Sequence, residues 1–291
     1  VRAQREIPCR AWSDRRRCHA MQAIASLPPF WTGVLGAVIA GFFGTAVGGV
    51  PVVVVRTLPA RLGNALLSFA AGVMLAATFF SLLLPALELA REVTGGRVPA
   101  AIGVIVALSV GGLAMAGAHR MTPHEHLGRG REGPHVQRMR RVWLFVIAIA
   151  IHNFPEGLAT GVAAGNPAPH LPDEIPGLGV VMGIGLQNMP EGLAVAVGLL
   201  SLGYGRGRAL LVAAATGLIE VVGGVAGAAA VSVSHALLPW ALAFAGGTML
   251  FVISHEIIPE THAPEAGGTI SATVALFIGF ATMLFLDHTL G

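Results

Sequence analysis

The segment VWLFVIAIAIHNFPEGLATGV, residues 142–162, is apolar enough to cross a membrane, yet it carries the polar stretch HNFPEG at 152–157. A bilayer core of about 30 Å needs roughly 20 apolar residues in a helix. A related stretch, QNMPEG at 187–192, lies in the next apolar segment. Charged side chains are costly near the bilayer centre and usually mark a function there. The two stretches therefore predict membrane-spanning helices with a polar site between them.

The composition excludes a soluble domain. The chain has 291 residues, of which 54% are hydrophobic and 11% charged, and its mean hydropathy is +0.74. Apolar runs of about 20 residues recur along it, whereas the short alternating segments of a transmembrane β-barrel do not. The isoelectric point of about 9.6 reflects arginines in loops, so nucleic-acid binding is not expected. The sequence predicts an all-α integral membrane protein surrounded by the lipid bilayer.

Eight transmembrane helices are expected, and their boundaries are uncertain by several residues. They cover residues 31–55, 64–87, 99–118, 142–162, 177–200, 208–232, 236–258 and 269–288. Together they form one transmembrane domain, residues 30–291.

The arginines of the loops predict the orientation in the membrane. Ten arginines lie in the loops after spans 1, 3 and 5, whereas only Arg91 and Arg97 lie in the loops after spans 2, 4 and 6. We therefore expect a multi-pass protein of the cytoplasmic (inner) membrane, with the loops after spans 1, 3, 5 and 7 in the cytoplasm and both termini outside. The six arginines of the N-terminal tail oppose this orientation.

Two segments lie outside the predicted helices. Residues 1–29 are expected to be a disordered tail or an artefact of the gene start, because the first methionine is Met21. The longest loop, residues 119–141, is predicted to be cytoplasmic and carries four histidines, namely His119, His124, His126 and His135. Neutral imidazole binds Zn²⁺ and its neighbours, so His124 and His126 are candidates for passing on metal. A polar loop without such a role is the alternative.

Three glutamates are predicted to lie at mid-membrane. Glu156, Glu191 and Glu220 each follow the start of their span by about 20 Å, at a rise of 1.5 Å per residue. His152 and Glu156 are four residues apart, as are Gln187 and Glu191, so each pair shares one face of its helix. These side chains can therefore converge between neighbouring helices.

A proline lies inside each polar stretch. Pro155 and Pro190 lack an amide donor, which frees the carbonyl groups of Ile151 and Leu186. Transporters tolerate broken helices at this depth where backbone oxygen lines an ion site. We therefore expect both helices to be opened at these positions.

The side chains of the cluster suit a transition metal. Imidazole nitrogen together with carboxylate oxygen favours Zn²⁺ over Mg²⁺ or Ca²⁺, which prefer oxygen alone. Three carboxylates also offset the charge of a divalent cation. The alternative is a set of interhelical hydrogen bonds that only stabilises the bundle. The doubled motif and the third glutamate favour the metal site.

With these motifs the chain resembles the ZIP (Zrt-/Irt-like) metal transporters, and within them the bacterial GufA-like branch. The likeness covers about residues 30–290 and rests on HNFPEG, QNMPEG, the histidine-bearing loop and HEIIPE at 255–260. It implies a 3+2+3 bundle, in which spans 1–3 and 6–8 are related by inverted symmetry. It also implies uptake of Zn²⁺, Cd²⁺, Fe²⁺ or Mn²⁺ into the cytoplasm by elevator-type alternating access. No enzymatic activity and no cofactor are expected, and a homodimer is compatible with the small-residue helix faces.

The resemblance assigns site residues by position. It implies a primary metal site at His152, Glu156, Gln187 and Glu191, which Met74 can join. It implies a second site at Asn153, Asn188 and Glu220, which shares Glu156 and Glu191. Some relatives carry Asp in place of Asn188, and a neutral amide attracts a second cation less strongly, so one bound metal is preferred.

Other candidate residues lie toward the ends of the helices. Glu88 is a candidate for attracting incoming cations, and His255 and Glu256 are candidates for an exit route. Each has a structural alternative: a solvated helix end for Glu88 and a hydrogen-bonded helix end for His255 and Glu256. For Met74 the alternative is an ordinary core methionine.

Other functions fit the sequence less well. A metal exporter on the same fold is the nearest alternative. An intramembrane metallohydrolase is disfavoured, because the sequence has no HExxH motif and Gln187 is a poor ligand for catalytic zinc. A metal-sensing or purely structural membrane protein is a third alternative. No P-loop motif is present, so facilitated diffusion and proton coupling both remain open.

Overall fold

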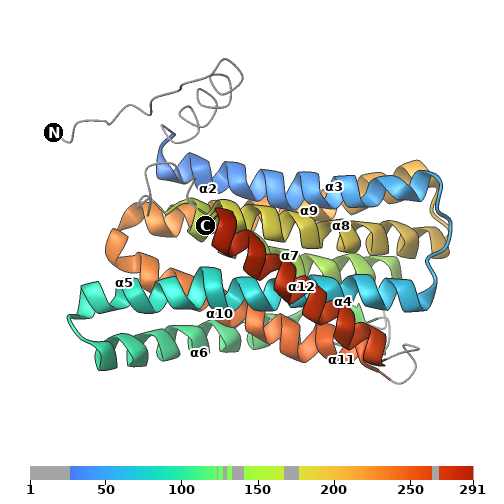
Figure 1. The fold of residues 1–291 in the computed structure, drawn as a ribbon. Coiled ribbons are helices and arrows are strands. Elements are labelled where there is room, and N and C mark those ends of the chain that lie inside the picture. Colours follow the sequence, from blue (N-terminus) through green and yellow to red (C-terminus); the bar gives the residue numbers. More distant parts are fainter. Residues whose placement is uncertain are drawn as a thin grey trace, which may run out of the picture.

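The structure is a computed structural model that describes residues 27–122, 124–126, 130–132, 141–166, 177–263 and 269–290. The predicted N-terminal tail up to residue 26 and His135 lie outside these residues. The described chain is almost entirely helical, and its long helical rods lie side by side (Figure 1).

Several rods consist of consecutive helical segments, some with π or 3₁₀ geometry. In chain order the described elements are α2 (Pro29–Ala37), η1 (Val38–Phe43), α3 (Gly44–Gly49), η2 (Val50–Val53), α4 (Ala60–Ala76), η3 (Ala77–Leu83), α5 (Leu84–Thr94), α6 (Arg97–Met121), β1 (His124–His126), β2 (Gly130–Glu132), α7 (Arg141–Ala164), α8 (Leu178–Ser201), α9 (Arg206–Val233), η5 (His235–Leu237), α10 (Leu238–Val252), η6 (Ile253–Ile257), α11 (Ile258–Thr261) and α12 (Thr269–Leu290).

The rods are long enough to cross a bilayer. Within the described residues, seven are also sufficiently apolar, namely Pro29–Val53, Ala60–Thr94, Arg97–Met121, Leu178–Ser201, Arg206–Val233, Leu238–Thr261 and Thr269–Leu290. The remaining rod, α7, has 24 residues, which corresponds to about 36 Å. Each predicted span coincides with one rod. The all-α membrane fold is confirmed, and the protein is a multi-pass membrane protein.

The loop predicted at residues 119–141 differs from the structure in two ways. Helix α6 continues to Met121, so His119 is helical. The following segment contains a small hairpin, in which β1 pairs antiparallel with β2 and His124 lies opposite Glu132. Hydropathy alone cannot find such a hairpin, because its residues are polar and its strands have three residues each.

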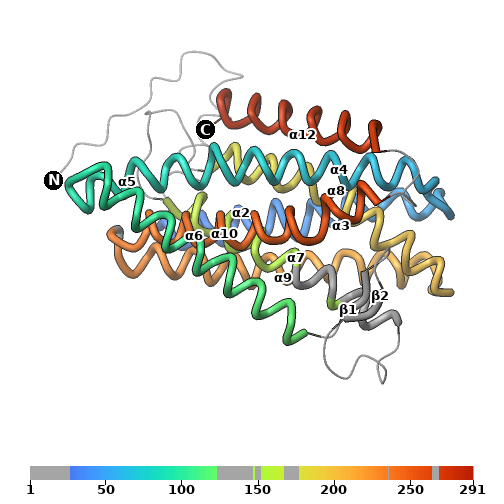
Figure 2. Tube along the Cα trace, turned by 90° about the horizontal axis from the view of Figure 1, so that it is seen from below, coloured from blue at the N-terminus to red at the C-terminus, as the bar shows by residue number. Residues whose placement is uncertain are grey.

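The rods pack as two groups (Figures 1 and 2). The site group consists of α2–η1–α3, α7, α8 and α9, and the support group consists of α4–η3–α5, α6, α10–η6–α11 and α12. The most extensive packing lies within the groups, between α7 and α9, between α4 and α12 and between α6 and α10. Smaller interfaces of α8 with α4 and α12, and of α7 with α10, join the two groups.

Glycine brings the helices of the site group into backbone contact. A Cβ atom built on Gly157 of α7 would lie 1.9 Å from the backbone oxygen of Glu220 on α9. One built on Gly223 of α9 would lie 2.3 Å from the backbone oxygen of Phe154 on α7. Small residues at such crossings are typical of helix packing in membranes. The α7–α9 interface therefore has no room for larger side chains.

The support group repeats this arrangement, whereas the approach of glycine to backbone between the groups is less close: a Cβ atom on Gly179 of α8 would lie 3.2 Å from the Cα atom of Asp287 on α12. A Cβ atom on Gly72 of α4 would lie 2.0 Å from the backbone oxygen of Leu276 on α12. Between the groups, Gly183 of α8 instead faces the side chain of Met283 on α12, whose sulfur would lie 2.1 Å from an added Cβ. A methionine side chain can move aside, but a helix backbone cannot. Each group is thus tightly built, and the contact between them is softer.

Candidate metal centre

Helix α7 carries the first polar stretch. It runs without interruption from Arg141 to Ala164 with Pro155 inside, so the opening that we expected at Pro155 is wrong. Glu156 is completely buried and Asn153 is 1% exposed, whereas the side chain of His152 is 18% exposed. Helix α9 packs closely against this part of α7. The side chains of HNFPEG, rather than a break in the helix, form this half of the site.

Helix α8 carries the second polar stretch in the same way. It is continuous from Leu178 to Ser201 with Pro190 inside, so the expected opening at Pro190 is also wrong. Gln187 and Asn188 are completely buried, and Glu191 is half-buried. The departures from α geometry lie elsewhere, in the π-helical segments η1, η3 and η6.

The glycine that ends each polar stretch admits a neighbouring helix. Gly157 admits α9, as described above. A Cβ atom on Gly192 of α8 would lie 2.1 Å from the backbone oxygen of Thr45 on α3. On the other side of Glu220, a Cβ atom on Gly41 of η1 would lie 2.5 Å from the Cβ atom of Glu220. These contacts enclose the polar residues between the rods of the site group.

Glu220 on α9 joins the two polar stretches. The side-chain amide of Asn153 donates a hydrogen bond to Glu220 Oε1 at 3.2 Å. The amide of Asn188 donates to both carboxylate oxygens, at 3.0 and 2.9 Å, and to the backbone oxygen of Ala40 at 2.9 Å. The structure therefore brings Asn153, Asn188 and Glu220 together, with both amides as donors.

Glu156 and Gln187 lack such partners. Neither carboxylate oxygen of Glu156 and neither polar atom of the Gln187 amide makes a hydrogen bond within the described part of the chain. Gln187 lies close enough to Glu156 for its amide to stabilise the carboxylate, although the two side chains do not reach the geometry of a hydrogen bond. The charges of Glu191 and Glu220 also act on Glu156. Buried polar groups are nearly always hydrogen-bonded, so these four atoms need an explanation. A cation among them would supply the missing partner.

The geometry is not that of a preformed centre with three strong ligands. Among the residues that the structure describes, no three His, Cys, Asp or Glu side chains are arranged to hold one ion. His152 accounts for part of this, because its Nε2 atom contacts the carboxylate of Glu256 on η6. Glu191 lies within electrostatic range of His152. Coordination through this cluster would therefore have to include amide oxygen or a rotation of His152.

Glu256 is the centre of a second polar cluster, at the boundary between the two groups. It is 2% exposed, and its Oε1 atom lies 3.2 Å from Nε2 of His119 on α6, which is 3% exposed. His255 is exposed; its ring stacks on Phe251 at 4.9 Å between centroids and meets the edge of His119 at 5.1 Å. The contact of Glu256 with His152 and His119 was missed in the sequence. The signal that could have placed His119 in a helix is its four-residue spacing from Met115 of the preceding apolar run, but no local pattern links His119 to Glu256.

The remaining predicted residues take no part in the polar contacts described above. Met74 is completely buried in a hydrophobic cluster with Ala71 and Ile184. Glu88 is exposed on α5. His124 and His126 lie on β1, which packs near α7.

Comparison with known proteins agrees with the architecture and the motifs. A family model described as ZIP zinc transporter matches residues 118–287. The zinc transporter GufA of Myxococcus xanthus is 42% identical over 259 residues, which cover 89% of this chain and 99% of the relative. The zinc transporter ZIPB of Bordetella bronchiseptica is 45% identical over 258 residues, which cover 89% of this chain and 81% of the relative.

A more distant relative extends the likeness beyond bacteria. The human zinc transporter ZIP11 is 31% identical over an alignment of 341 residues, which covers 89% of this chain and 98% of the relative. These similarities extend over nearly the whole transmembrane domain, and the family model includes both polar stretches, Glu220 and Glu256. The chain belongs to the ZIP family of zinc transporters, and it is a transporter rather than an enzyme.

Proposed function

We propose that the protein carries Zn²⁺ across the cytoplasmic (inner) membrane through the polar cluster between α7, α8 and α9. The observation that carries this proposal is the set of four buried, unsatisfied polar atoms of Glu156 and Gln187. A buried carboxylate without a partner costs several kcal/mol, and a divalent cation beside it removes that cost. The names of the relatives support zinc as the cargo. Cd²⁺, Fe²⁺ and Mn²⁺ are further candidate cargoes.

Four side chains on α7 and α8 form the proposed primary site. They are His152, Glu156, Gln187 and Glu191. His152 reaches the ion by exchanging its contact with Glu256 for metal coordination. Met74 adds a thioether from α4, which is most useful for a soft ion such as Cd²⁺. The carboxylates of Glu156 and Glu191 balance the charge of the ion.

The neighbouring cluster at Glu220 supports one bound ion rather than two. Asn153 and Asn188 already satisfy the carboxylate of Glu220 by donating hydrogen bonds. Their side-chain oxygens are buried and lack hydrogen bonds in the described residues, so they offer only neutral ligands. A second divalent cation would meet a single carboxylate of its own, Glu220, and would share Glu156 and Glu191 with the first.

Transport follows from movement of the site group along the support group. The site group carries the proposed ligands apart from Met74 and packs internally through backbone contacts. Its boundary with α4, α10 and α12 is made by smaller interfaces that include adaptable side chains. Such a boundary favours an elevator-type motion. We assign the direction as uptake into the cytoplasm, and export on the same fold is the alternative.

A path for the ion leads through the polar residues at the group boundary. Glu88 on the exposed surface of α5 attracts cations at the outer end. Glu256, His119 and His255 receive the ion after the primary site, because Glu256 already contacts His152. His124 and His126 on β1 continue this path toward the cytoplasm.

Reconstitution of the full chain in liposomes tests the function. With a zinc indicator enclosed in the vesicles, wild-type protein should produce influx when Zn²⁺ is added outside. Glu156→Gln removes one charged ligand with little change of shape, and influx should slow at least about 10- to 100-fold, the range found when groups that support a metal site are lost.

Glu92→Gln is the matched control, because Glu92 is an exposed carboxylate on α5 that is not a ligand of the proposed metal site. It should transport at the wild-type rate. Influx by Glu156→Gln at that same rate would refute the proposed site. Vesicles loaded with zinc distinguish export from uptake.

A further inference from the structure

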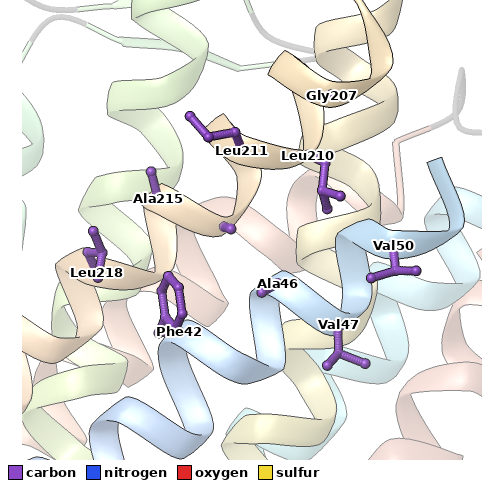
Figure 3. A pocket seen from close by; sticks show the side chains of 10 residues that line it. Phe42, Ala46, Val47, Val50, Gly207, Leu210, Leu211, Ala215 and Leu218 are labelled. Atoms are coloured by element: carbon purple, nitrogen blue, oxygen red, sulfur yellow. The ribbon is translucent and has the colours of Figure 1, made fainter. Parts of the chain in front are cut away.

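An apolar groove runs along the lipid-facing side of the site group (Figure 3). It has a volume of about 620 Å³ and lies between the rod α2–η1–α3–η2 and helix α9. Phe42 and Val47 line one wall, and Leu211 and Leu218 line the other. Val47 is 52% exposed and Leu211 is 70% exposed, so the groove is open to its surroundings. Both walls belong to membrane-spanning rods, which makes the bilayer its immediate neighbour.

The groove has the depth of one leaflet. It extends along α9 from Gly207 to Leu218, which corresponds to about 16 Å at the rise of an α-helix. Half of a bilayer core of about 30 Å is 15 Å. A single acyl chain that starts at the headgroup region therefore fits along the groove without crossing the midplane.

The end of the groove at Gly207 is positively charged. Arg206 and Arg208 flank Gly207 at the start of α9, and both are exposed. Neither wall offers a competing carboxylate: the sequence has no Asp or Glu from residue 29 to residue 87, and the first acidic residue of α9 is Glu220. The first amides of α9 have no side-chain cap at Gly205 and add to the attraction for an anion.

We propose that this groove binds one anionic phospholipid, with an acyl chain between α3 and α9 and its phosphate at Arg206 and Arg208. The apolar walls account for the chain, and the two arginines account for the headgroup charge. Each wall is part of the site group, so the lipid sits on the group that carries the proposed metal ligands. The lipid site does not depend on the proposed transport function.

Native mass spectrometry of the full-length protein in detergent tests the proposal. Phosphatidylglycerol and phosphatidylcholine with identical acyl chains are added separately, and bound lipid is counted. We expect wild type to bind one phosphatidylglycerol about 30-fold more tightly than phosphatidylcholine, the effect of two arginines near a membrane surface. Arg206→Gln/Arg208→Gln should abolish this preference. Arg91→Gln/Arg97→Gln, which removes two exposed arginines at the α5–α6 turn, should retain it.

Two substitutions in the groove test the acyl chain. Ala215→Phe fills the groove and should weaken binding of both lipids. Leu211→Gln places a polar amide on the exposed wall and should weaken binding of both lipids as well. Equal binding of the two lipids by wild type would overturn the proposal, as would an undiminished preference in Arg206→Gln/Arg208→Gln. A wild-type dimer that dissociates with Leu211→Gln would also overturn it, because a second copy would then occupy the groove.

Discussion

The site group and the support group differ in what they bury. The site group encloses Glu156, Gln187 and Glu220, which are completely buried among helices that touch through glycine. Among the described residues of the support group, the buried titratable side chains are His119 and Glu256, both at the boundary with α7. The site group thus holds the buried polar residues, whereas the support group is largely apolar and has its buried polar residues where it meets α7.

Locking the two groups together should have the largest effect. A Cβ atom on Gly183 of α8 would lie 3.6 Å from Cγ1 of Val73 on α4. Side chains at these two positions therefore meet across the boundary, and Gly183→Cys/Val73→Cys is the pair to cross-link. In a background in which Cys9 and Cys18 are replaced by serine, oxidation should stop zinc influx into liposomes, and reductant should restore it. The physical reason is that the cross-link prevents the site group from sliding.

A cross-link inside the site group is the matched control. A Cβ atom on Gly49 of α3 would lie 3.6 Å from the Cβ atom of Ala213 on α9. Oxidised Gly49→Cys/Ala213→Cys should therefore transport as before, since both residues move together. Unimpaired influx by the oxidised cross-group variant would contradict the two-group account.

Glycine substitutions should separate the two kinds of interface. Gly157→Ala places a methyl group against the backbone of α9 and should lower the free energy of unfolding by about 3 kcal/mol. Gly183→Ala meets the flexible side chain of the buried Met283 and makes only ordinary contact with Val73, so it should cost about 1 kcal/mol or less. Thermal unfolding in detergent measures both. A loss of unfolding free energy in Gly183→Ala as large as that in Gly157→Ala would show that the boundary is as tightly packed as the interior of each group.

A smaller change is expected from Asn188→Asp. The substitution removes the amide that donates to Glu220 and Ala40 and places a second carboxylate beside Glu220. Like charges then destabilise the metal-free protein, and a second cation relieves them. The metal content of the purified protein should rise from about one ion per chain to about two, and Zn²⁺ should stabilise the variant more than it stabilises wild type. An unchanged ion count would mean that the amide does not limit occupancy.

The membrane spans could be predicted because hydropathy and length determine them almost alone. All eight predicted spans coincide with rods, and the largest error is at residue 87, where the structure continues to Thr94. The π-helical segments were missed, since apolar periodicity does not distinguish them from α-helix. The opening expected at Pro155 was wrong, because close packing against α9 maintains the helix there.

The sequence predicts which residues belong to the candidate site, but it does not predict which of them contact one another. The four-residue spacing of His152 and Glu156 reveals a shared helix face from the sequence alone. The hydrogen bonds of Glu220 depend on how α7, α8 and α9 meet, and the contact of His152 with Glu256 joins residues 104 positions apart. Contacts of this kind come from tertiary packing, which local periodicity does not encode.

The most direct test of the central claim is the position of the bound metal. Crystals of the full chain soaked in Cd²⁺ or Zn²⁺ and measured for anomalous scattering should show one strong peak. Its ligands should be His152, Glu156, Gln187 and Glu191, with His152 rotated away from Glu256. Peaks confined to surface histidines, with the cluster between α7 and α8 empty, would contradict the account.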